Sequence, residues 1–205
     1  MGRKSHGFTL IEALVTVAII GILAALAAPA FVKMLERNRL KGAAEAVFNE
    51  LQLARTEAVK RNQDVTVTFS GAGPSTTWAY GLRSGLAGTT CDPSVDLSNV
   101  NACQLYYLDT SVTPPSLSPE NVLRVTRSSD YPGVSLKVTF QAAASPVALP
   151  RAEFEPHRGT ADVAGRACLN LDNDALQVVV SPLGRILICT TTGMPGYQPC
   201  PSPCP

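Results

Sequence analysis

Charged and chemically reactive side chains are scarce in this sequence of 205 residues. Asp, Glu, Lys and Arg make up 16% of the chain, aromatic residues make up 6%, and there are two histidines. Hydrophobic residues make up 45%, which excludes an intrinsically disordered chain. The net charge of +1 gives no bulk attraction to nucleic acid. The length allows one domain, or one domain with an appendage.

Signatures of catalytic and metal sites are also missing. There is no paired Cys-x-x-Cys, which argues against a zinc site. His157 lies in a predicted strand-entry turn, where a lone histidine is usually structural. Asp172 and Asp174 resemble half of a calcium loop, but Gln177 and Leu183 stand where that loop needs its glycine and its glutamate. The sequence therefore predicts no enzyme, no metal and no cofactor.

The charge is distributed unevenly along the chain. Residues 1–62 hold nine Lys or Arg and five Asp or Glu, a net charge of +4. Residues 63–205 hold eight and eleven, a net charge of −3. The N-terminal part and the remainder are therefore expected to differ in structure.

An uncharged run of twenty residues, 13–32, dominates the N-terminal part. A helix of that length matches a hydrocarbon core of about 30 Å. Arg3 and Lys4 precede the run, so the positive-inside rule places that end in the cytoplasm and the bulk of the chain outside. Three interpretations compete: a secretory signal peptide with small residues at 28–30, a plain membrane anchor, or a helix that assembles with others.

Glu12 decides between these interpretations, because it interrupts an apolar stretch that begins at Phe8. A carboxylate costs about 2.5–3.5 kcal/mol at the membrane centre and somewhat less near an edge, so a signal peptide or plain anchor would gain by losing it. Cleavage after Gly7 would leave an ammonium group on Phe8, mostly charged near neutral pH. The ammonium of one subunit could neutralise Glu12 of its neighbour. This pairing predicts helices packed with a fixed stagger, as in a filament.

The residues 7–12, GFTLIE, followed by an apolar helix, resemble the class III signal of type IV prepilins and type II secretion pseudopilins. The resemblance implies that a prepilin peptidase cleaves between Gly7 and Phe8, so that residues 1–7 are a leader and 198 residues remain. It also implies N-methylation of Phe8, and it makes Glu12 the assembly-directing carboxylate. Pilin helices carry a proline where Pro29 lies, and proline kinks or loosens a helix.

The helical pattern continues beyond the apolar run. From residue 33 to 62 apolar side chains recur every three or four positions, which predicts one helix from Phe8 to about Asn62. Residues 8–32 are expected in the membrane or the filament core, and 33–62 against a globular domain. The predicted apolar stripe contains Leu40, Ala44, Val47, Leu51, Ala54 and Ala58, with Phe48 and Val59 beside it. The polar faces are expected to hold Glu36, Arg37, Arg39, Lys41, Glu45, Glu50, Arg55, Glu57, Lys60 and Arg61.

After Asn62 the pattern changes to short strand-like runs, so residues 63–205 are predicted to form a β-rich globular domain outside the membrane. The short connections favour antiparallel pairing. The predicted fold class is α+β and type IV pilin-like: one long helix packed against an antiparallel sheet. The predicted strands cover residues 65–69, 78–82, 104–108, 122–126, 134–140, 167–171, 177–180 and 185–189. Loops are expected at 71–75, 110–119 and 142–150, and the tail from 193 to 205 is expected to be irregular.

Six cysteines follow the apolar segment, where oxidation and disulfide formation are expected. Six cysteines allow fifteen pairings. Proximity in sequence favours Cys91 with Cys103, Cys168 with Cys189, and Cys200 with Cys204.

Three further strings extend the resemblance to the GspH/FimT family of minor pilins and pseudopilins: residues 53–59 with Arg61-Asn62, residues 154–160, and residues 178–185. The similarity is good over 8–82 and 154–189 and poor from Cys91 to Pro150. It implies a single-pass protein of the inner membrane with a periplasmic head, which then enters a filament. The implied partners are other pilins, the prepilin peptidase, the assembly platform and, before assembly, membrane lipid.

Two functions remain open. The first is a structural role in the initiating or tip complex of a type IV pilus or a secretion pseudopilus. The second is DNA binding for natural transformation, since some family members contact phosphates through a Gly-Arg-x-Arg element. Here Gly184-Arg185 keeps the first arginine, and Leu187 replaces the second. Arg185 and Arg158 are the candidate DNA contacts, with Arg151 and Arg166 as further members of a basic cluster. The net charge of −3 over residues 63–205 disfavours this function.

Overall fold

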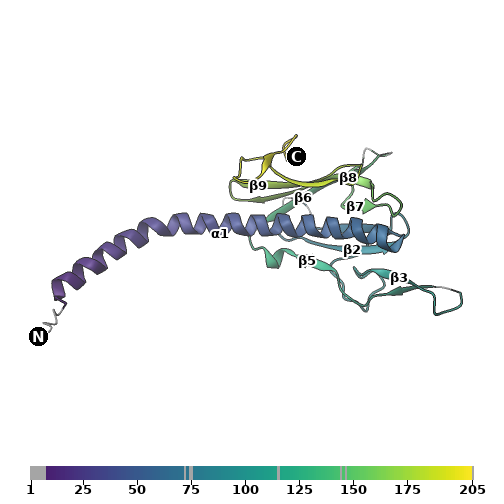
Figure 1. Cartoon of the computed structure of the whole chain (residues 1–205), viewed down its shortest axis with the longest axis horizontal. Helices are drawn as coiled ribbons and strands as arrows, with labels where there is room; N and C mark the ends of the chain where they lie inside the picture. The colour runs from purple at the N-terminus through teal and green to yellow at the C-terminus, as the bar shows by residue number, and fades with distance from the viewer. Residues whose placement is uncertain are drawn as a thin grey trace, which may run out of the picture. The chain divides into compact units, whose positions relative to one another are not determined.

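The structure is a computed structural model that describes residues 8–71, 73, 76–114, 116–143, 145 and 147–204. It divides into two compact units, residues 1–38 and 39–205. One long helix, α1 (Leu10–Arg61), begins in the first unit and ends in the second, as Figure 1 shows. The helix predicted from Phe8 to about Asn62 is thus present, and Pro29 lies inside it.

The second half of α1 buries one face in the sheet domain. All six residues of the predicted apolar stripe are completely buried, and Ala43 joins them. Phe48 packs partly buried against the core, whereas Val59 is 52% exposed. Glu57 is also buried, contrary to the expectation that it lies on a polar face. Its carboxylate can be buried because Arg61 and Lys60 neutralise it at 2.6 and 3.3 Å.

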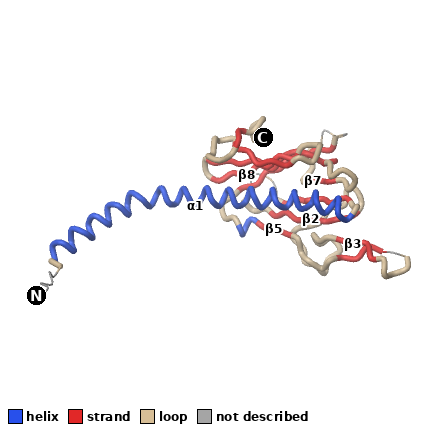
Figure 2. The backbone as a smooth tube through the Cα atoms, viewed as in Figure 1, coloured by secondary structure: helices blue, strands red, loops and turns tan. Residues whose placement is uncertain are grey.

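Strands follow α1, and Figure 2 shows them around its second half. They are β1 (Asp64–Ser70), β2 (Ala79–Gly85), β3 (Tyr106–Asp109), β4 (Ser116–Pro119), β5 (Val125–Arg127), β6 (Ser135–Ala142), β7 (Arg151–Phe154), β8 (Ala161–Leu171), β9 (Asp174–Val180), β10 (Ile186–Thr190) and β11 (Gln198–Pro199). A short 3₁₀ helix, η1 (Ser128–Asp130), lies between β5 and β6.

The strands form a large sheet in the order β11-β10-β9-β8-β7-β1-β2-β5, with β6 added on β8, and a separate β3–β4 hairpin. All these pairs are antiparallel except β10 with β11. The long strand β8 pairs with β7 at its start, with β9 towards its end, and with β6 along most of its length. The predicted antiparallel sheet on a long helix, and with it the pilin-like fold class, is confirmed.

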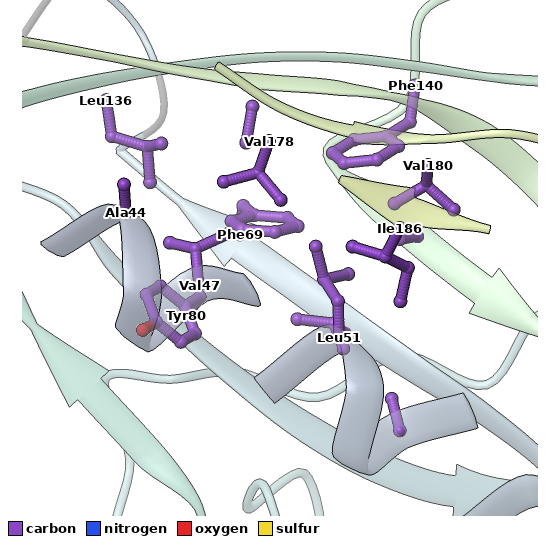
Figure 3. Close-up of a cluster of buried hydrophobic side chains, with 14 of the residues drawn as sticks. Ala44, Val47, Leu51, Phe69, Tyr80, Leu136, Phe140, Val178, Val180 and Ile186 are labelled. Carbon is purple, nitrogen blue, oxygen red and sulfur yellow. The ribbon is translucent and has the colours of Figure 1, made fainter. Parts of the chain in front are cut away.

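The core lies between the sheet and the buried face of α1. Figure 3 shows Val47 and Leu51 of α1 among side chains of several strands. Phe69 stacks on Phe140 with ring centroids 5.5 Å apart and contacts Tyr80 at 5.7 Å. The core therefore joins β1, β2 and β6 to α1 through large aromatic side chains, which bury the most apolar surface per residue.

Several strands differ from the sequence prediction. β4 occupies part of the expected loop 110–119, and β11 lies in the tail that was expected to be irregular. β7 and the first residues of β8 were not predicted. In β7 the buried Glu153 interrupts the apolar pattern; it forms an ion pair with Arg151 and accepts a hydrogen bond from the backbone of Gly88. The strand predicted at 122–126 begins only at Val125.

The disulfides agree with sequence proximity in one case and differ in two. Cys91 bonds to Cys103, as predicted. Cys168 bonds to Cys204 and Cys189 to Cys200, so the predicted pairs Cys168–Cys189 and Cys200–Cys204 are wrong.

The sheet register explains the error. Cys168 on β8 and Cys189 on β10 both lie opposite Gln177 of β9. The two cysteines are therefore two strand spacings apart, about 10 Å, which is beyond the reach of a disulfide. The C-terminal tail instead crosses this row of residues, and its Cys204 and Cys200 form disulfides with Cys168 and Cys189. It buries Gln177, whose Nε2 lies 3.2 Å from Cys168 Sγ and 3.6 Å from Cys204 Sγ.

Candidate functional site

The start of α1 holds Glu12 in a defined position. Thr9 precedes the helix, and its Oγ1 accepts a hydrogen bond from the backbone N–H of Glu12 at 3.3 Å. Thr9 is therefore the N-cap and Glu12 stands three residues into the helix, the spacing of a capping box. A carboxylate in the first turn also complements the helix dipole. The sequence reasoning missed this cap, although the Thr-x-x-Glu spacing signals it.

The apolar segment of α1 is uncovered. Its most apolar window of 18 residues has a mean hydropathy of 2.6, and none of it is buried. From Phe8 to Leu35 the exposed large apolar side chains range from 47% to 78% exposure. Among the described residues, α1 is the one helix long and apolar enough to cross a membrane. So much apolar surface needs lipid or other helices around it.

Of the cleavage-site residues, Phe8 is described and 71% exposed, while Gly7 lies outside the described residues, as do Arg3 and Lys4.

A junction in the head brings together three strings that lie far apart in the sequence. Arg55 of α1 donates a hydrogen bond from Nε to the carbonyl oxygen of Gly159 at 3.0 Å. Gly184 has a φ of +76° and packs so closely on Gly159 that an added Cβ would clash with its carbonyl group. The backbone N–H of Ala161 also donates to Pro182 O at 3.0 Å. The helix, the turn 155–160 and the turn 181–185 are thereby fixed to one another.

The candidate DNA contacts lie beside this junction. Arg158 and Arg185 are exposed and directly adjoin Gly159 and Gly184. Arg158 pairs with Glu155 at 3.3 Å. The hydrogen bond from Thr160, together with the charge of Arg158, lowers the pKa of Glu155, which therefore stays anionic at neutral pH.

Arg151 and Arg166 are not part of this basic pair. Arg151 pairs with Glu153 at 3.4 Å. Arg166 donates to Ser202 and to the carbonyl oxygen of Pro203 at 3.2 Å in the C-terminal tail. The structure thus brings two of the four candidate arginines together and gives the other two separate partners.

The end of α1 carries a second polar cluster, which the sequence reasoning missed. Arg61 pairs with Glu57 and with Glu120, and its Nη1 donates to the carbonyl oxygen of Tyr106 at 2.9 Å. The side chains of Arg61 and Glu57 are 11% and 10% exposed. Burial alone would raise the pKa of Glu57, but the hydrogen bonds and charges of Arg61 and Lys60 outweigh it and lower the pKa. This cluster fixes the β3–β4 hairpin to the helix.

The described residues contain no group of three or more His, Cys, Asp or Glu that could hold a metal ion. His157 is exposed in the turn after β7, and Asp172 lies in the turn between β8 and β9 with a φ of +53°.

Comparison with known proteins identifies the family. Residues 43–184 match the family of the type II transport protein GspH, and residues 2–28 match the prokaryotic N-terminal methylation motif. The chain belongs to the GspH family. It is therefore a protein of the minor pilin and pseudopilin type, from a type IV pilus or a type II secretion system, and it assembles with other pilins in a filament. Pilins and pseudopilins are structural subunits, so this GspH-family chain is not an enzyme, as predicted.

Two crystal structures of the type IV minor pilin FimU from Pseudomonas aeruginosa (strain PAO1) are similar to this GspH-family chain. The sequence identities are 17% and 20%, and the TM-scores are 0.41 and 0.44. The similarity covers 77% and 79% of this chain and 98% and 96% of the FimU chains. No protein of curated function matches the chain.

Proposed function

We propose that this chain is a minor subunit of the initiating or tip complex of a type IV pilus or type II secretion pseudopilus. The observation that carries the proposal is the combination of Glu12, held in the first turn of α1, with an apolar N-terminal segment of α1 that no other described part of the chain covers. A membrane covers this surface before assembly, and the helices of neighbouring subunits cover it afterwards.

The chemistry of assembly follows from the position of Glu12. Cleavage after Gly7 would create an ammonium group on Phe8, four residues before Glu12. Because α1 begins at Leu10, Phe8 lies before the helix, and its amine precedes Glu12 by at least one helical turn of about 5.4 Å. The ammonium of one subunit meets Glu12 of the next when the two helices are staggered by about one helical turn. In an apolar surrounding an unpaired carboxylate is costly, so this pairing selects one register among many.

Placement in the inner membrane with a periplasmic head belongs to the same proposal. The three disulfides support it, since disulfides persist in oxidising compartments. Prepilin peptidase and the assembly platform are the proposed partners before filament entry.

The variant Glu12→Ala tests the proposal. We expect it to reach the membrane in normal amounts and to be missing from purified filaments. Glu45→Ala is the matched control, because Glu45 is an exposed carboxylate on α1 outside the apolar segment. Incorporation of Glu12→Ala at the level of Glu45→Ala would overturn the proposed role of Glu12.

DNA binding for natural transformation is the alternative function, and one observation favours it. Arg158 and Arg185 adjoin two glycines in backbone contact, beside Arg55. The anionic Glu155 and the missing second arginine of the phosphate-binding element weigh against it. The structural role is therefore the function that we favour.

A further inference from the structure

Residues 200–204 of the C-terminal tail form a short strap across the sheet. One end of the strap, Cys200, is bonded to Cys189 of β10, and the other end, Cys204, is bonded to Cys168 of β8. Figure 1 shows the end of the chain beside β8 and β9. Because β9 lies between the two bonded strands, the strap joins points that are two strand spacings apart, about 10 Å. We call Cys200 and Cys204 the strap cysteines.

A bond between the two strap cysteines is the competing product. Only three residues separate them in the sequence, and cysteines close in sequence lose little chain entropy when they pair. In the folded sheet Cys168 and Cys189 are too far apart to bond to each other, so the competing bond would leave both as free thiols. In the structure all six cysteines are paired and none is free. The strap therefore needs a feature that opposes its own closure.

The strap has such a feature in Pro201 and Pro203, which we call the strap prolines. A proline disfavours the helical conformation of the residue before it, so Cys200 and Ser202 are both biased towards extended backbone. A disulfide needs Cα atoms within about 7 Å. A helical turn brings residues four apart to about 6 Å, whereas an extended proline-rich segment separates them by about 12 Å. The strap prolines thus favour a separation at which the strap cysteines cannot bond.

Core packing does not account for these prolines, because both are exposed. The residue between them is the one that the sheet holds. Arg166 donates hydrogen bonds to the hydroxyl group of Ser202 and to the carbonyl oxygen of Pro203, the latter at 3.2 Å. Arg166 and Cys168 are two residues apart on β8, so their side chains leave the same face of the sheet. The chain bends at Ser202, and this anchored bend places Cys204 at Cys168.

We propose that the strap prolines direct disulfide formation in the head: they keep the strap cysteines apart, so that each one bonds to a different strand. They are positioning residues, because they act through the backbone of the cysteines and take no part in the exchange of bonds. Each native bond forms when two thiols transfer two protons and two electrons to an external disulfide, which is reduced to two thiols. This role is the same whether the chain belongs to a pilus or to a secretion pseudopilus.

Oxidative refolding of the full chain in detergent tests the proposal. The reduced chain, unfolded in urea, is returned to native conditions with oxidised and reduced glutathione, and free thiols are alkylated at set times. Chymotrypsin cleaves after Tyr197 and so separates Cys189 from the strap. Mass spectrometry without reduction then distinguishes a closed strap from a strap that is linked to β8 and β10.

The variant Pro201→Ala/Pro203→Ala is expected to raise the fraction of chains with a closed strap about fivefold, since each lost proline frees backbone conformations worth a factor of about two or more. The same chains should carry two alkylated thiols, at Cys168 and Cys189. An unchanged fraction of closed straps would overturn the proposal.

The matched control is Pro195→Ala/Pro199→Ala, because both prolines are exposed in the same tail but lie outside the strap. We expect this variant to give the same disulfides as the wild type. A rise in closed straps as large as that of the strap-proline variant would show that any loosening of the tail has the effect, and would contradict the role of Pro201 and Pro203.

A second measurement separates this role from a contribution to stability. In the background Cys168→Ser/Cys189→Ser the strap cysteines have lost their partners on the sheet. The equilibrium of their bond with glutathione then gives the effective concentration of one strap thiol at the other. Replacing both strap prolines by alanine should raise this concentration about fivefold. A merely stabilising role of the prolines would leave it unchanged, and that result would also overturn the proposal.

Discussion

Replacing Gly184 by alanine should destabilise the head strongly, because two separate penalties act at this position. Its φ of +76° lies in the left-handed region, where an L-residue costs about 1–2 kcal/mol. The added Cβ would also lie 3.1 Å from Arg55 Nε and closer still to the carbonyl oxygen of Gly159. Forcing an extra carbon into such a contact costs about 1–3 kcal/mol. Together the two penalties amount to roughly 2–5 kcal/mol.

Gly193→Ala separates the two penalties. Gly193 has a similar φ of +79°, but a Cβ there would meet nothing within 4 Å. This variant should therefore lose only the conformational part, about 1–2 kcal/mol. The difference between the two variants measures the close packing of the 181–185 turn on the 155–160 turn.

Fluorescence of Trp78 gives the assay. It is the single tryptophan of the chain and is 3% exposed, so its emission reports unfolding of the head. The free energy of unfolding of the full chain in detergent is measured by urea titration for the wild type and both variants. Equal losses for Gly184→Ala and Gly193→Ala would show that the junction between the two turns is not packed as described.

Four further predictions concern other parts of the head. The hydrogen bonds and charges of Arg61 and Lys60 outweigh burial and lower the pKa of Glu57, so the ionised carboxylate stabilises the fold above pH 4.5 and this stabilisation is lost as the pH falls through the lowered pKa. Glu57→Gln should therefore lower the free energy of unfolding by about 2 kcal/mol at pH 7. In urea titrations at acid pH the difference between the wild type and this variant should shrink. Burial raises the pKa of Glu50, so Glu50→Gln should leave stability unchanged or increase it at pH 7, and a marked loss would contradict this. Peptide mapping without reduction should recover peptides linked through Cys168–Cys204 and Cys189–Cys200. The Cys168–Cys204 bond closes a loop of 36 residues, so in the urea titration the double variant Cys168→Ser/Cys204→Ser should lose about 4 kcal/mol of the free energy of unfolding. Binding to duplex DNA at two salt concentrations should be weak and unchanged in Arg185→Ala; steep salt dependence that this variant abolishes would favour the DNA-binding alternative.

The elements with a strong local pattern could be predicted from the sequence. The stripe from Leu40 to Ala58 marks the buried face of α1, because its spacing follows the helical repeat. β1 was predicted nearly to its ends, since Val65, Val67 and Phe69 alternate with polar residues. Cys91 and Cys103 could be paired because a short loop joins them.

Features that depend on the register of distant strands could not be predicted. The disulfides of Cys168 and Cys189 follow from their common neighbour Gln177, which only the pairing of β8, β9 and β10 reveals. The contact of Arg55 with Gly159 joins residues 104 positions apart. Glu57 and Glu153 look like surface residues in the sequence, and only their ion pairs explain their burial.

The central claim is that Glu12 pairs with the ammonium group that cleavage creates on Phe8 of a neighbouring subunit. It is tested most directly by the intact mass and N-terminal sequence of the protein recovered from the cell envelope. The proposal predicts a chain of 198 residues that begins at Phe8 and carries a methyl group on its amine. A chain that still begins at Met1, or one that begins near Ala30, would contradict it.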